Sequence, residues 1–181
     1  MAEVVLPLGG ASPRVETVAG LRVEEVGDMA LASVAARRAG GLREAAEAMG
    51  LPLPGPGRWE ARGEVGAIWL GPDQWLVEAP LATHEDVAAW LKPRLGASAS
   101  VTEQTDAWAR LDLRGRLGPV VERLANLDWA RFPPGSATRA LLEHMGAVVV
   151  RRDEDWLSLL VGRSFAGSLH HAAVQAARAA L

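Results

Sequence analysis

The stretch Ala67-Ile68-Trp69-Leu70-Gly71-Pro72-Asp73-Gln74-Trp75-Leu76-Val77 contains two short apolar runs, each with one tryptophan. Between the runs lies Gly-Pro-Asp-Gln, in which proline presets φ and aspartate favours a turn. Apolar runs of this length joined by a short turn are typical of a β-hairpin. The stretch therefore predicts two paired strands with a tryptophan in each.

Upstream of this hairpin, Leu21 to Val26 and Met29 to about Ala36 are predicted strands, and Gly27-Asp28 between them is typical of a two-residue turn. Residues 41–49 carry apolar side chains at helical spacing and precede a glycine, which predicts a short amphipathic helix. Downstream, residues 83–93 predict a second helix that ends or kinks at its proline.

The order of strands and helices then recurs in the second half of the chain. Strands are predicted over 100–104, 107–114, 137–143, 147–151 and 156–161, and helices after Gly118 and Ser164. Two halves of this kind, about 21–95 and 98–181, predict an α+β protein built as a pseudo-duplicated pair of split β-α-β modules. Residues 21–181 are expected to form a single α+β domain made of these halves.

The first 20 residues lack any periodicity and are rich in glycine, proline and alanine. They predict a flexible N-terminal arm. The arm carries Val4, Val5, Leu6 and Leu8, so it is either a disordered tail or a segment that orders on a partner.

The composition excludes several classes of function. A net charge of −3 provides no basic surface for nucleic acid, and the absence of cysteine excludes disulfides, thiolate nucleophiles and cysteine-ligated metals. No segment has the ~20 apolar residues of a membrane helix, and the N-terminus lacks the features of a signal peptide. The cytoplasm is the expected location.

No catalytic, metal-binding or cofactor-binding pattern is complete in this sequence. The four histidines form no ligand pair, and no glycine cluster has the context of a nucleotide-binding loop. The segment Gly162-Arg163-Ser164-Phe165-Ala166-Gly167 lacks the glycine two residues after serine that a nucleophile elbow requires. Catalytic, cofactor-binding and metal residues are therefore expected to be absent from this chain.

The candidates for a partner interface are Arg58, Trp59, Trp108 and Arg163. Tryptophan and arginine are the residues that most often anchor protein interfaces. Trp59 lies in a proline-rich loop, and Trp108 lies on the polar face of its predicted strand, so neither fits a core position well. Arg163 is interpreted either as a solvated side chain or as an interface clamp for an anion.

The chain resembles the gamma subunit of heterotetrameric sarcosine oxidase, a relative of the folate-binding aminomethyltransferase (T-protein) fold. Four segments carry the resemblance, in the order of the family, and they span the last two-thirds of the chain. They are the hairpin 67–77, Thr105-Asp106-Ala107-Trp108-Ala109, Phe132-Pro133-Pro134-Gly135-Ser136-Ala137 and Arg163-Ser164-Phe165-Ala166.

The resemblance implies a T-protein-like fold and a non-catalytic subunit that packs on the alpha subunit of a cytoplasmic complex. It implies alpha, beta and delta subunits as partners. That complex oxidatively demethylates sarcosine to glycine and transfers the one-carbon unit to tetrahydrofolate. FAD, FMN, NAD and tetrahydrofolate are implied for the other subunits, and none of them for this chain.

Two alternatives remain open from the sequence. A stand-alone folate-binding or one-carbon-transfer protein of the same fold would need an acidic residue in a pocket, and Asp106 or Glu103 would have to serve. Asp106 is otherwise interpreted as a turn residue between two strands. A free-standing scaffold or regulator without a flavoenzyme partner is the second alternative.

Overall fold

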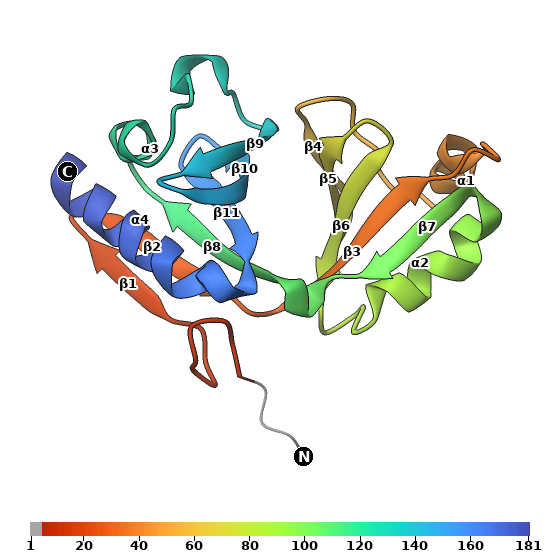
Figure 1. Ribbon diagram of the computed structural model, residues 1–181, viewed down its shortest axis with the longest axis horizontal. Helices are drawn as coiled ribbons and strands as arrows, with labels where there is room; N and C mark the ends of the chain where they lie inside the picture. Colours follow the sequence, from red (N-terminus) through yellow and green to blue (C-terminus); the bar gives the residue numbers. More distant parts are fainter. Residues whose placement is uncertain (1–4) are drawn as a thin grey trace. The chain divides into compact units, whose positions relative to one another are not determined.

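The computed structural model describes residues 5–181, and its chain divides into two compact units (Figure 1). Unit 1 contains the residues up to Gly27 and those from Asp106 to Leu181, and unit 2 contains Asp28–Thr105. Each unit has its own sheet and its own apolar core. Within the described residues, no helix is long and apolar enough to cross a membrane.

Unit 2 is an antiparallel sheet with two α-helices. The order of its strands across the sheet is β4-β5-β6-β3-β7. Its elements, in chain order, are β3 (Met29–Ala36), α1 (Leu42–Ala48), β4 (Trp59–Arg62), β5 (Val65–Gly71), β6 (Gln74–Pro80), α2 (Val87–Leu95) and β7 (Ala99–Glu103).

Unit 1 has an antiparallel sheet with the strand order β1-β2-β8-β11-β10-β9. Two α-helices and several short 3₁₀ turns accompany it. Its elements are β1 (Val15–Val18), β2 (Leu21–Val26), β8 (Trp108–Arg114), α3 (Gly118–Leu124), β9 (Ala137–Leu142), β10 (Met145–Asp153), β11 (Trp156–Gly162) and α4 (Ala166–Ala180).

The two units repeat one topology. In unit 2 the chain runs β3-α1-β4-β5-β6-α2-β7, and in unit 1 it runs β8-α3-β9-β10-β11-α4 with the same sheet order. Strand β6 separates β3 from β5, which is the split β-α-β arrangement, and β11 separates β8 from β10 in the same way. The predicted α+β class with pseudo-duplicated split β-α-β modules is therefore confirmed.

The units differ in the origin of one strand. In unit 2, β7 follows α2 and pairs with β3. In unit 1 the chain ends after α4, and β2 from near the N-terminus takes the corresponding place beside β8. The compact units therefore do not coincide with the expected halves, about 21–95 and 98–181. Gly27-Asp28 is where the chain passes from one unit to the other, so the predicted turn between paired strands is wrong.

The tryptophan hairpin lies in the sheet of unit 2 as predicted. Trp69 of β5 is opposite Trp75 of β6, and the turn places Asp73 in the left-handed region with φ of 58°. Trp75 is buried in the core of the unit, and its Nε1 donates to the carbonyl of Pro54 at 2.9 Å. This hydrogen bond ties the proline-rich loop to the hairpin.

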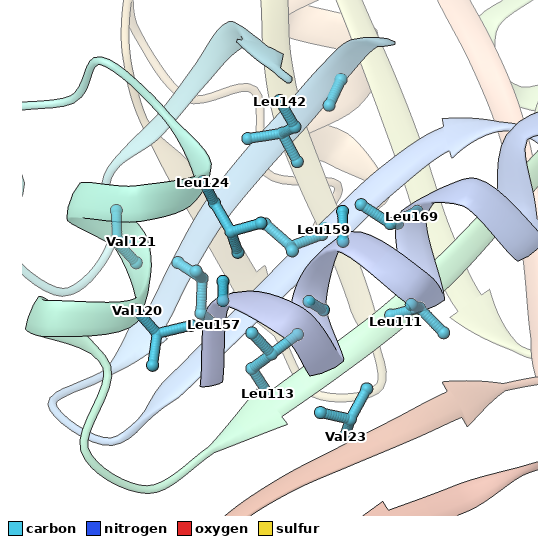
Figure 2. Close-up of a cluster of buried hydrophobic side chains, with 14 of the residues drawn as sticks. Val23, Leu111, Leu113, Val120, Val121, Leu124, Leu142, Leu157, Leu159 and Leu169 are labelled. Carbon is cyan, nitrogen blue, oxygen red and sulfur yellow. The ribbon is translucent and has the colours of Figure 1, made fainter. Parts of the chain in front are cut away.

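The core of unit 1 follows the alternation predicted for β8. Ala109, Leu111 and Leu113 point into the apolar core, and the residues between them lie on the opposite face of the sheet. Figure 2 shows this core, in which leucines of β8 and β11 lie with side chains of α3 and α4. Burial of large aliphatic side chains on this scale stabilises each strand by a few kcal/mol, at roughly 1.5–3 kcal/mol per side chain.

The N-terminal arm predicted for residues 1–20 is structured over much of its described length. Val15–Val18 forms β1 and pairs with β2. The carboxylate of Glu25, only 2% exposed, accepts from the backbone N–H of Leu8 at 2.7 Å and of Arg14 at 3.1 Å. Leu6 is buried against Gly27, where an added Cβ would lie 2.5 Å from its Cδ2. Val4 lies outside the described residues.

We expect Glu25→Ala to release residues 6–14 from the body of unit 1. Two backbone donors that Glu25 satisfies would lose their acceptor, which costs about 1–3 kcal/mol of unfolding free energy. Urea denaturation measures the stability, and the rate of tryptic cleavage at Arg14 measures the release. Glu24→Ala is the matched control, since Glu24 only forms an exposed ion pair with Arg22, and it should leave both measurements nearly unchanged. Equal effects of the two variants would contradict the anchoring role.

Candidate functional site

Three of the residues selected from the sequence meet at one end of the unit 1 sheet. Trp108 begins β8 and is opposite Gly162, the last residue of β11, so Asp106 and Arg163 flank the same strand ends. Nη1 of Arg163 lies 3.5 Å from Oδ1 of Asp106, and its Nη2 donates to the carbonyl of Val5. Arg163 thus holds the N-terminal segment and the residues before β8, which is a more specific role than a solvated side chain.

Apolar side chains are exposed at the same end of unit 1. Val5, whose carbonyl Arg163 binds, is exposed, and so is Phe165 in the turn after β11. Leu141 of β9 is 68% exposed. A hollow of about 610 Å³ lies beside Leu141, and Trp108 forms part of its lining. Exposed apolar side chains beside a hollow are typical of a surface that another molecule covers.

The other two interface candidates, Arg58 and Trp59, lie in unit 2. Arg58 is exposed, whereas Trp59 is the half-buried first residue of β4. Nε1 of Trp59 donates to Oε1 of the buried Glu78 at 2.7 Å, directly over Gly66. Trp59 is therefore held within its own unit by a specific hydrogen bond.

The acidic residues of the folate alternative are both exposed, and their contacts are local. Oε1 of Glu103 accepts from the backbone N–H of Thr105 at 2.6 Å. Asp106 is the middle residue of the short 3₁₀ turn Thr105–Ala107 before β8, and it contacts Arg163. The chain passes from unit 2 to unit 1 between these two acidic residues.

A buried polar network on the face of β8 opposite the core was not predicted. Oδ1 of Asp112 accepts from Nε of Arg110 and Oγ of Ser158, both at 2.7 Å. Its Oδ2 accepts from Nη2 of Arg110 at 2.9 Å and Nε1 of Trp156 at 2.8 Å. Nε of Arg152 donates to Ser158 at 3.0 Å, so the network spans β8, β11 and β10. The alternation in β8 places Arg110 and Asp112 on one face, but their partners depend on strand register.

His170 of α4 is a buried titratable group with an altered pKa. Burial lowers the pKa of His170 below its usual value, and the neighbouring positive charge of Arg14 lowers it further. A carboxylate oxygen of Glu16 in β1 lies 3.6 Å from Nε2 of His170, and its negative charge raises the pKa of His170. That nitrogen has no hydrogen-bond partner within the described part of the chain. His170 is therefore mainly neutral near pH 7.

The side chains at the end of the unit 1 sheet suit the binding of another molecule. Across residues 5–181, no three His, Cys, Asp or Glu side chains are grouped so that they could hold a metal ion. Asp112 has all its acceptor capacity engaged by neighbouring donors, and Asp106 contacts an arginine. The arrangement at the end of unit 1 instead combines exposed apolar groups with cationic arginines.

Residues 32–179 match the model of the sarcosine oxidase, gamma subunit family. This chain belongs to the sarcosine oxidase gamma subunit family. The match covers most of the chain and includes every segment on which the resemblance in the sequence was based. The gamma-subunit role predicted from those segments is confirmed, and other subunits are the partners of a protein of this kind.

Solved structures agree with this assignment at the level of the fold. A chain of the heterotetrameric sarcosine oxidase from Corynebacterium sp. U-96, in complex with pyrrole 2-carboxylate, has a TM-score of 0.78 and 23% identity. The similarity covers 89% of this chain and 87% of that one. The glycine cleavage system aminomethyltransferase T from Bartonella henselae has a TM-score of 0.64 and 15% identity, over 85% of this chain and 48% of that one. The T-protein-like fold is thus confirmed. No curated protein sequence gives a significant match.

In this gamma subunit, we expect Asp112→Ala to destabilise unit 1 by about 3–5 kcal/mol, because it removes one partner of a buried ion pair. Asp106→Ala should leave stability close to that of the parent, since the Asp106 side chain is 93% exposed in its pair with Arg163. Urea denaturation of both variants gives the comparison. Similar losses in the two variants would show that the network around Asp112 has no special structural role.

The stability of the gamma subunit should fall as the pH is lowered below about 6.5, the pKa of an unperturbed histidine. The unfolded chain takes up a proton on His170 there, whereas the folded chain does so only at lower pH, so protonation favours unfolding. Urea midpoints measured from about pH 5 to 7.5 should show a shallower slope for His170→Asn. The adjacent, exposed His171 supplies the control, His171→Asn, whose slope should match the parent. An unchanged slope in His170→Asn would refute the assignment.

Proposed function

We propose that this chain acts as the non-catalytic gamma subunit of a heterotetrameric sarcosine oxidase and packs on the alpha subunit of that complex. The family match over residues 32–179 is the observation that carries this proposal. The partners are alpha, beta and delta subunits. The complex oxidatively demethylates sarcosine to glycine and transfers the one-carbon unit to tetrahydrofolate in the cytoplasm.

The cofactors of that reaction belong to the other subunits in this proposal. FAD, FMN, NAD and tetrahydrofolate are assigned to them, and this chain contributes no catalytic residue. The chemistry of the described site supports such a division. The exposed carboxylate of Asp106 at the end of unit 1 contacts Arg163, and the buried carboxylate of Asp112 accepts from donors of its own sheet.

The folate-binding alternative has less support. It requires an acidic side chain inside a pocket, whereas the side chains of Asp106 and Glu103 are both exposed. The backbone N–H of Thr105 and the guanidinium of Arg163 are their contacts. An acidic side chain in open solvent has no means of excluding water from a bound ligand.

Co-expression with the alpha, beta and delta subunits from the same organism tests the proposed function. A tagged gamma subunit should co-purify with flavin absorbance and sarcosine-dependent peroxide formation. The chain purified alone should show neither signal.

Failure of the parent chain to co-purify with any of those subunits would overturn the proposal. Saturable quenching of tryptophan fluorescence by tetrahydrofolate, lost in Asp106→Ala, would favour the folate-binding alternative instead.

A further inference from the structure

One transverse row of residues crosses the end of the unit 1 sheet. Trp108 of β8 is opposite Gly162 of β11, and Gly146 of β10 is opposite Leu141 of β9. Because Ala147 pairs with Val161, the next residues outward, Gly146 and Gly162, are also neighbours. The row therefore reads Trp, Gly, Gly, Leu across four strands.

This row lies on the face of the sheet opposite the helix-packed core. The residues adjacent to it in sequence point into that core, and side chains alternate along a strand. These core residues are Ala109, Val161, Ala147 and Leu142. Trp108 and Leu141 therefore both rise from the face opposite the core, at the end of the sheet, with two glycines between them that carry no side chain.

The two glycines make a trough, and backbone geometry does not explain their presence. Gly146 has no left-handed φ, and Gly162 has φ of −54°, so other residues could adopt both conformations. A Cβ added at Gly146 would meet no atom within 4 Å. The hollow of about 610 Å³ lies here, and Val148 continues its apolar lining. What the glycines provide is space.

Exposed apolar side chains gather around this trough. Leu141 is 68% exposed and also borders a second hollow, of about 580 Å³, on the side of the loop after α3. Phe165 is 48% exposed, and its Cδ2 lies 3.7 Å from where a Cβ of Gly162 would be. Exposed apolar side chains gathered beside hollows are typical of a surface that another molecule covers.

The charge and the free edge at the trough indicate what it binds. Arg139 of β9 lines the hollow and is exposed, and its guanidinium forms no ion pair with any residue that the structure describes. In the described residues, β9 is the last strand of the sheet, and an isolated bridge from Ala125 covers only its end at Leu142. Such an edge can pair with an extended segment of another protein.

We propose that this trough, formed by Trp108, Gly146, Val148, Leu141 and Arg139, binds an extended segment of a partner subunit. The segment places a large apolar side chain over Gly146, between Trp108 and Leu141, and a carboxylate beside Arg139. This inference rests on the proposed function, because a gamma subunit needs such a partner. It adds the surface at which the partner docks and the chemistry of the docking segment.

Gly146→Val tests the trough directly, because valine suits a strand and fills the space without a clash. In the co-expressed complex, we expect the Kd between the tagged gamma subunit and the remaining subunits to rise at least about tenfold, as for loss of an interface anchor. The urea midpoint of the isolated chain should stay unchanged. Gly71→Val in β5 is the matched control, since Gly71 also lacks left-handed φ and has open space around its Cβ position.

Two further variants test Leu141 and the charge of Arg139. Leu141→Asp should weaken association about as much as Gly146→Val, whereas Val15→Asp, at an exposed position of β1, should not. Arg139→Glu should also weaken it and should reduce its dependence on salt. If the parent chain assembles and Gly146→Val, Leu141→Asp and Arg139→Glu assemble equally well, the trough is not the docking surface. If the parent chain itself does not assemble with the other subunits, that result overturns the proposed function on which the trough depends.

Discussion

Strand β2 pairs with β8 from Arg22 opposite Arg114 to Val26 opposite Arg110. On its other side β8 pairs with β11, so the sheet of unit 1 joins a strand from near the N-terminus to strands from the second half of the sequence. Leu21 and Val23 of β2 are fully buried in the unit 1 core. Without β2, one side of β8 would lack its hydrogen-bonding neighbour and the core would lack two large side chains. The N-terminal segment is therefore structural, and the anchoring of residues 6–14 by Glu25 depends on it.

Local sequence patterns predicted much of the fold. The tryptophan hairpin and the alternation of Ala109, Leu111 and Leu113 are correct because turn chemistry and side-chain periodicity act over a few residues. The sequence around Gly27-Asp28 wrongly predicts a turn between paired strands, because a short polar connection looks the same whether its flanking strands pair or enter different sheets. Strand pairing between distant segments leaves no comparable local signal, so local patterns do not reveal the compact units.

The candidate site shows the same limit. Trp108 and Arg163 lie more than 50 residues apart in sequence, and only the register between β8 and β11 brings them to one end of the sheet. Asp112 acquires its role from Trp156 and Ser158, which are 44 and 46 residues away in sequence. Gly146 offered no motif at all. Its proposed role follows from Leu141 opposite it and from its ordinary backbone conformation, which does not require glycine.

The position of β2 also has a consequence for synthesis on the ribosome. Unit 2 is a continuous segment, Asp28–Thr105, and can fold as soon as its last residue has emerged. Strand β2 emerges before all of unit 2 and pairs with β1, but its other edge has to wait for β8, so that edge stays unpaired while the whole of unit 2 is made. An unpaired strand edge can pair with another chain during that interval, which favours aggregation. A circular permutant that moves the first 27 residues to the C-terminus would deliver β2 after β8, so that β2 would find its partner strand already made.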